Sequence, residues 1–234
     1  MNLNNFNSLI ELFFYQSERQ NPKSIFLEWL NPNNKKIFTW EETTLNIFKF
    51  SKVLKETVKN GDRCLLVSEN RPEWFISDLA IMLANAITVP AYTTYTEDDY
   101  KYLIEDSEPS IVIVSNNEML NKLKKTINEK DFIKKVITFE KIEKAHNDLN
   151  EDDKNKYLDF SSIIKNDLSE KDKIKNINLK RTSPACIIYT SGTGGNPKGV
   201  ILSHGGILNN LVGACEIMKP LIDTRPIFLT WLPL

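Results

Sequence analysis

The sequence is poor in the residues that build metal centres and disulfide frameworks. Its 234 residues include three cysteines and two histidines. Cys64, Cys186 and Cys215 are widely spaced, odd in number and set among apolar neighbours, which is typical of reduced, buried thiols. His146 and His204 add too few further ligands for a zinc site. We therefore expect neither a disulfide scaffold nor a structural zinc ion.

An excess of charge of one sign is also missing. Thirty basic residues oppose thirty-one acidic ones, which leaves a formal net charge of -1. No global field therefore favours nucleic acid or an anionic membrane, and nucleic acid is not an expected partner. Any anion that the protein binds must be held by local groups.

Long apolar runs are absent as well. The most apolar region, residues 79–92, is broken by Asn85 and Pro90 and is shorter than the roughly 20 residues that cross a bilayer. The N-terminus lacks the basic start and apolar stretch of a secretory signal. We expect no transmembrane segment and a cytoplasmic location, with peripheral membrane contact left open. With 41% hydrophobic residues, the chain has enough apolar material for a sizeable core.

What is present is an alternation of short apolar runs with helical segments. The pattern predicts a helix over residues 8–19, a hairpin on either side of residues 31–34, and a helix from 41 to about 58 that is closed near Gly61. Strands are then expected at 64–68, 87–89, 110–115 and 185–190, and helices from Pro72 and over 97–106. The run at 110–115 does not alternate, which indicates burial on both faces. Residues 116–180 are highly polar but keep enough apolar residues to be structured. The fold class is therefore α/β, with a largely parallel sheet flanked by helices.

A glycine-rich loop follows the last of these strands directly. After residues 185–190 come Ser191, Gly192, Thr193, Gly194, Gly195, Asn196, Pro197, Lys198 and Gly199. Glycines allow backbone amides to converge on an anion, the hydroxyls of Thr190, Ser191 and Thr193 add donors, and Lys198 adds a positive charge. A plain turn between strand and helix needs none of these groups together. The loop therefore predicts a polyphosphate site.

Two other phosphate motifs fit the loop poorly. A Walker loop requires Ser or Thr after its lysine, whereas Gly199 follows Lys198. The dinucleotide fingerprint fails because its third glycine position holds Pro197. A P-loop kinase or GTPase stays as a disfavoured alternative.

The run YTSGTGGNPKGV, residues 189–200, closely resembles the phosphate-loop signature of the adenylate-forming (AMP-binding) superfamily. This superfamily includes acyl-CoA synthetases, luciferases and the adenylation domains of peptide synthetases. Gly194 stands where the family usually has a second threonine. Residues 61–92 resemble the early region of long-chain fatty acyl-CoA synthetases, with Asn85 at a position that is usually glycine, and residues 38–42 are a weaker match to an N-terminal family motif.

The resemblance implies a set of site residues and a reaction. Thr190 would help to hold Mg²⁺, Thr193 and Lys198 would be catalytic, and the ATP phosphates would be bound by Thr190, Ser191, Gly192, Thr193, Gly194, Gly195 and Lys198. The implied function is ATP-dependent activation of a fatty acid to acyl-adenylate and then acyl-CoA, with coenzyme A as co-substrate. Residues 1–234 would be the N-terminal portion of the adenylation domain, cut within the apolar run 227–234, and inactive without the C-terminal remainder and the mobile domain. A non-catalytic nucleotide-binding module, or transfer of the acyl group to a carrier protein, remains an alternative.

Three other polar features have a structural interpretation. His204 is expected at the start of a helix rather than in catalysis. Arg71, Glu73 and Trp74 fit a capped helix start with the tryptophan in the core. The acidic residues 97–99 fit the first turn of a helix better than a metal site.

Overall fold

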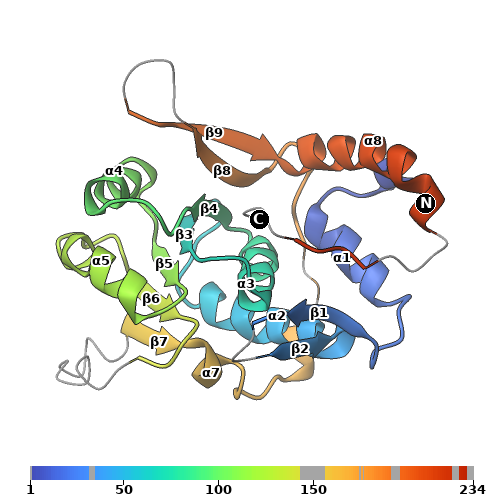
Figure 1. Cartoon of the computed structure of the whole chain (residues 1–234), viewed down its shortest axis with the longest axis horizontal. Helices are drawn as coiled ribbons and strands as arrows, with labels where there is room; N and C mark the ends of the chain where they lie inside the picture. Colours follow the sequence, from blue (N-terminus) through green and yellow to red (C-terminus); the bar gives the residue numbers. More distant parts are fainter. Residues whose placement is uncertain are drawn as a thin grey trace.

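The computed structural model describes residues 2–31, 35–142, 156–173, 175, 177–190, 196–222 and 227–230. Figure 1 shows a sheet with helices on both faces and a long hairpin that extends beyond the other strands. The first elements are η1 (Leu3–Asn5), α1 (Leu9–Ser17), β1 (Ile25–Trp29), β2 (Lys36–Thr39) and α2 (Trp40–Lys55). β1 and β2 pair antiparallel, so the predicted hairpin is confirmed.

Side-chain caps explain where the N-terminal helices begin. Ser8 accepts a hydrogen bond from the backbone N–H of Glu11 at 3.3 Å and starts α1. Thr39 and Glu42 form a reciprocal capping box at the start of α2, an arrangement that satisfies amides left unpaired in the first turn. α2 ends at Lys55, slightly before the end expected from the sequence.

The main sheet contains seven strands in the described part of the chain, in the order β7-β6-β5-β3-β4-β8-β9. Its elements are β3 (Arg63–Val67), α3 (Pro72–Leu83), β4 (Ile87–Ala91), α4 (Glu97–Ser107), β5 (Ile111–Val114), α5 (Asn117–Asn128), β6 (Lys135–Thr138), β7 (Tyr157–Asp159), α7 (Phe160–Ile163), η3 (Glu170–Lys173), β8 (Pro184–Thr190), β9 (Lys198–Ser203) and α8 (His204–Ile222). Neighbouring strands run parallel except β8 and β9, which are antiparallel. The predicted α/β class is confirmed.

Side chains that alternate along the central strands belong to two separate hydrophobic cores, one on each face of the sheet. On β3, Cys64 and Leu66 belong to the core shared with α1, α2 and α3, whereas Leu65 and Val67 belong to the core shared with α4 and α5. Successive side chains of a strand point to opposite faces, so a strand covered on both sides must be apolar throughout. β5 is buried along its whole length, as its sequence predicted.

Two residues with left-handed backbone meet at the amino end of the sheet. Gly61 has a φ of 82° and Asn85 a φ of 57°. The N–H of Gly61 donates to the backbone oxygen of Asn85 at 2.8 Å. Asparagine tolerates this conformation better than other residues with a Cβ, which explains how it can replace a glycine here.

Some expectations from the sequence are wrong. Cys215 on α8 is exposed, whereas Cys64 is buried as predicted. The apolar run 185–190 predicted a buried strand, but β8 is partly exposed, because Ile188 is 37% exposed. The apolar run 227–234 is strand-like in sequence, but its residues 227–230 form no strand and are exposed. These differences share a cause, since burial depends on which elements face one another and not on hydrophobicity alone.

Among the helices of the described residues, none has both the length and the apolar character needed to span a bilayer.

Candidate functional site

The predicted phosphate loop is carried by the hairpin of β8 and β9. Thr190, the last residue of β8, lies opposite Lys198, the first residue of β9. Both side chains are exposed. The two strands therefore bring the first and last candidate ligands to the same place, at the mouth of the loop.

The other predicted phosphate ligands fall between these two positions. Ser191, Gly192, Thr193, Gly194 and Gly195 lie outside the described residues. Their proposed contacts with ATP therefore stay predictions, and the placement of Thr190 and Lys198 is what the fold contributes to the site.

The packing of β8 against β9 explains one glycine of the motif. Tyr189 is 6% exposed and belongs to the core that contains α4 and α5. A Cβ on Gly199 would lie 2.9 Å from Cγ2 of Ile187 and 3.3 Å from Cζ of Tyr189. Since real Cβ atoms essentially never come as close as 2.9 Å to another heavy atom, the contact with Ile187 requires glycine here and allows β9 to pair closely with β8.

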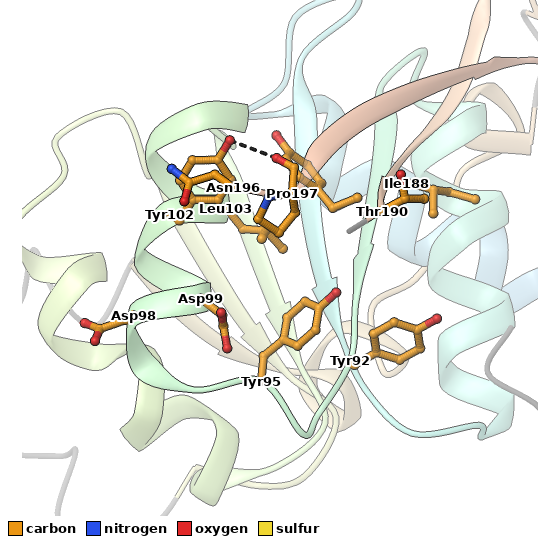
Figure 2. Close-up of a pocket in the computed structure, with 11 residues that line it drawn as sticks. Tyr92, Tyr95, Asp98, Asp99, Tyr102, Leu103, Ile188, Thr190, Asn196 and Pro197 are labelled. Atoms are coloured by element: carbon orange, nitrogen blue, oxygen red, sulfur yellow. Dashed lines mark hydrogen bonds between the residues drawn. The ribbon is translucent and has the colours of Figure 1, made fainter. Parts of the chain in front are cut away.

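A cavity of about 590 Å³ opens beside the loop, between α4 and the hairpin. Figure 2 shows Tyr92, Tyr95 and Tyr102 along it, with Thr190 and Pro197 on the hairpin side. Sequence reasoning missed these tyrosines as site residues. A signal was available, because several tyrosines follow the carboxyl end of β4, where ligands of parallel sheets commonly bind.

The acidic residues at the start of α4 act as a helix terminus, in agreement with their structural interpretation. Asp99 accepts hydrogen bonds from the backbone N–H of Thr96 at 2.9 Å and from its hydroxyl at 2.7 Å. These bonds lower the pKa of Asp99. No cluster of metal-binding side chains is present among the residues that the structure describes.

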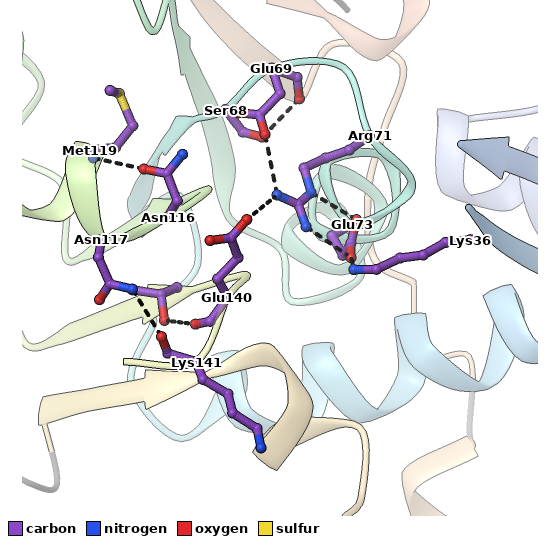
Figure 3. A network of polar contacts seen from close by, with 11 residues as sticks. Lys36, Ser68, Glu69, Arg71, Glu73, Asn116, Asn117, Met119, Glu140 and Lys141 are labelled. Carbon is purple, nitrogen blue, oxygen red and sulfur yellow. Dashed lines mark hydrogen bonds and ion pairs between the residues drawn. The ribbon is translucent and has the colours of Figure 1, made fainter. Parts of the chain in front are cut away.

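The Arg71 group, formed by Arg71, Glu73, Lys36, Glu69 and Glu140, is an ionic network around the buried pair of Arg71 and Glu73 (Figure 3). Arg71 Nε lies 2.9 Å from Oε2 of Glu73, and Nη2 lies 3.2 Å from Oε1. Lys36 Nζ reaches the same carboxylate at 2.5 Å. The second guanidinium amine, Nη1, lies 3.2 Å from Glu69 and 3.5 Å from Glu140.

This network stabilises the fold and does not resemble a ligand site. Arg71 is the N-cap residue of α3 but makes no side-chain cap, so the expected capped start is wrong in that detail. Its guanidinium carbon lies 4.6 Å above the ring of Trp29. Burial alone would raise the pKa of Glu73, but the hydrogen bonds and charges of Arg71 and Lys36 outweigh it, and the pKa is lowered. Every nitrogen of the guanidinium faces a carboxylate, so the group is already engaged within the protein.

His204 and Arg181 anchor the hairpin and α8 to the N-terminal segment. His204 is 1% exposed, and its Nδ1 accepts from the backbone N–H of Leu9 at 3.3 Å. Burial lowers the pKa of His204 to about 4, so the ring is neutral at pH 7. Arg181 donates to the backbone oxygen of Phe6 at 2.7 Å and to Oδ1 of Asn209 at 2.7 Å. This placement agrees with a structural role for the histidine.

A family model described as AMP-binding enzyme matches residues 14–234. The chain belongs to this family. The match includes the hairpin with its glycine-rich loop and both cores of the sheet, so the family assignment covers nearly the whole fold described above.

Known members of the AMP-binding family show how much of a complete protein this chain represents. Long chain acyl-CoA synthetase 4 of Arabidopsis thaliana is 29% identical over 201 residues, which cover 84% of this chain. The chain spans 30% of the length of that relative.

Two solved structures share the fold. The anthranilate CoA ligase AuaEII in complex with anthranoyl-AMP aligns with a TM-score of 0.71 and 19% identity, over 87% of this chain and 36% of that protein. ATP-bound MatB from Rhodopseudomonas palustris aligns with a TM-score of 0.68 and 20% identity, over 94% of this chain and 38% of that protein. This chain therefore has the fold of the N-terminal part of an adenylate-forming enzyme.

Proposed function

We propose that this chain supplies the phosphate-binding part of an AMP-forming ligase that activates a fatty acid to acyl-adenylate and then to acyl-CoA. The observation that carries the proposal is the position of the two ends of the loop. Thr190 and Lys198 lie opposite each other on β8 and β9, and the glycines and hydroxyls of the signature lie between them in the sequence. The resemblance of residues 61–92 to long-chain synthetases, and the relative of that name, support a fatty acid as substrate.

The reaction requires charge stabilisation more than covalent help from the protein. A carboxylate oxygen bonds to the α-phosphorus of ATP, the bond from that phosphorus to the bridging oxygen breaks, and pyrophosphate leaves. The thiol of coenzyme A then attacks the acyl carbonyl and displaces AMP. The loop amides, the hydroxyls of Ser191 and Thr193, and the ammonium of Lys198 would bind the β and γ phosphates and stabilise the leaving pyrophosphate.

The residues at the mouth of the loop fit a magnesium ion bound together with the nucleotide. Mg²⁺ prefers oxygen ligands and commonly takes few from the protein, with phosphates and water completing its shell. Thr190 offers an exposed hydroxyl at this point. We assign Thr190 as a ligand of that ion, which when bound neutralises charge on the phosphates.

An exposed apolar surface supports a further part of the adenylation domain beyond residues 1–234. Val200 and Ile201 on β9, and Ile217 and Leu221 on α8, are 44%, 63%, 82% and 46% exposed. Exposed apolar side chains on these two elements are available to pack against a further part of the domain. We propose that residues 1–234 are the N-terminal portion of the domain, and that the remainder covers this surface and supplies the base, ribose and acyl contacts.

Pyrophosphate exchange tests the function. A protein with the complete domain should exchange pyrophosphate into ATP only when a fatty acid is present, and Lys198→Ala should slow exchange by about 10²- to 10³-fold, as expected when one stabilising donor of the transition state is lost. Lys101→Ala, which removes an exposed lysine of α4, is the matched control and should change little. An equal loss in both variants would contradict the role of Lys198.

The products separate this proposal from its alternatives. AMP and pyrophosphate support a ligase, whereas ADP would indicate a kinase. Residues 1–234 alone should show no exchange, since phosphate contacts without acyl and base contacts cannot align the reactants. Exchange by this chain alone would refute the need for a remainder, and a strict requirement for a carrier-protein thiol would replace coenzyme A as acceptor.

A further inference from the structure

Helix α4 contacts both ends of the glycine-rich loop. The hydroxyl of Tyr102 donates to the backbone oxygen of Pro197 at 2.9 Å, just after the loop (Figure 2). The hydroxyl of Tyr189, just before the loop, donates to Oδ2 of Asp106 at 2.5 Å. Residues 102 and 106 are one helical turn apart and so share a face of α4. That face meets the hairpin at the two points where the chain enters and leaves the loop.

The two contacts reinforce each other. The rings of Tyr102 and Tyr189 pack edge to face with centroids 6.4 Å apart. Burial and the hydrogen bond to Asp106 raise the pKa of Tyr189, so its proton stays in place to be donated. A hydrogen bond to a carboxylate is shorter and stronger than one between neutral groups. The start of the loop is therefore firmly attached to α4.

The hairpin benefits from such support because β8 has little strand pairing with the rest of the sheet near the loop. The register of β8 with β4 is a single pair, Thr88 with Cys186. From there the hairpin extends beyond the other strands (Figure 1). Past that pair, side chains of α4 add hydrogen bonds to Tyr189 and Pro197.

We propose that Tyr102 and Asp106 are positioning residues that fix the separation of Tyr189 and Pro197, the two ends of the loop, and so favour the binding of Mg·ATP. The inference rests on the proposed function of the loop. Groups that are ordered before the ligand arrives do not lose that freedom on binding, which strengthens affinity and transition-state stabilisation. Each acts through an end of the loop, because Tyr102 bonds the backbone oxygen of Pro197 and Asp106 bonds the hydroxyl of Tyr189.

Hydrogen exchange tests the positioning without any ligand. Tyr102→Phe removes one hydroxyl, and Asp106→Ala removes the acceptor of Tyr189. Each should speed amide exchange in the peptide that contains the loop by about five- to tenfold, the change expected for one lost hydrogen bond. Tyr157→Phe is the matched control, because its hydroxyl bonds Asn128 at 3.2 Å on another edge of the sheet. Unchanged exchange in the loop of Tyr102→Phe would overturn the inference.

Kinetics then test the consequence for ATP. In the protein with the complete domain, Tyr102→Phe and Asp106→Ala should raise KM for Mg·ATP about five- to tenfold and leave KM for the fatty acid unchanged. Asp106→Asn keeps one acceptor oxygen and should recover most of the loss. Equal rises in both KM values would indicate general destabilisation and overturn the inference. The two proposals can fail separately. If the variants change hydrogen exchange in the loop but the wild type binds no ATP, the proposed function is wrong and the positioning of the loop by α4 still holds.

Discussion

Replacing Arg71 by methionine should destabilise the protein more than a surface substitution can. The change keeps a long apolar side chain but removes the guanidinium from a site where Arg71 and Glu73 have side-chain exposures of 1% and 2%. Removing one partner of a buried ion pair costs about 3–5 kcal/mol, because the other charge is left uncompensated. Lys36 still reaches Glu73, so we expect about 3 kcal/mol. Glu69 and Glu140 are 42% and 52% exposed and add little.

Denaturant unfolding and calorimetry measure this loss. For a chain of 234 residues, the unfolding entropy is about 0.5 kcal/mol/K, so 3 kcal/mol lowers Tm by about 6 °C. Lys173→Met is the control. Its pair with Glu170 has side-chain exposures of 40% and 89%, and its loss should cost at most about 0.5 kcal/mol.

A double-mutant cycle with Glu73→Leu decides whether the pair is the cause. Since both charges are then gone, the double variant should lose less unfolding free energy than the two single losses added together, by about 2 kcal/mol or more. The pKa of Glu73 is lowered in the folded state, so the stability it contributes is present above pH 4.5 and is lost as the pH falls through the folded pKa. The difference in unfolding free energy between wild type and Arg71→Met should therefore become smaller at acidic pH. A loss below about 1 kcal/mol, or additive effects in the cycle, would refute the reasoning.

Two further predictions concern stability and pH, and the two residues change stability in opposite directions as the pH rises. Burial raises the pKa of Asp78 to about 6 despite a hydrogen bond from Thr88, so ionisation of this carboxyl lowers the free energy of unfolding as the pH rises from about 4 to 6. Asp78→Asn should therefore raise the free energy of unfolding by up to about 3 kcal/mol above pH 6 and by little below pH 4. A gain that is the same at every pH would contradict this. Burial lowers the pKa of His204 to about 4, so the protein loses stability as the pH drops from 6.5 to 4. His204→Asn, which keeps an acceptor for the N–H of Leu9, should make Tm depend less on pH over that interval. An unchanged dependence of Tm on pH would count against this role of His204.

Much of the fold could be predicted because its signals are local. β5 is an unbroken apolar run, and a strand covered on both faces has to be one. Ser8 and the pair Thr39 and Glu42 mark helix starts by chemistry that needs only neighbours in the sequence. The exposed face of β8 could not be predicted, since an apolar strand has the same sequence whether or not another layer covers it.

The candidate site divides in the same way. The sequence by itself predicts a phosphate loop, because the glycines, hydroxyls and lysine of such a loop are close together in the sequence. Only the tertiary structure decided what holds the loop: Tyr102 and Asp106 lie far from Tyr189 and Pro197 in sequence and reach them only because α4 packs beside the hairpin. Likewise, Arg71 and Glu73 are neighbours in sequence, but Lys36 and Glu140 join them through folding. Contacts of this kind depend on how elements pack in three dimensions, which the local pattern of residues does not encode.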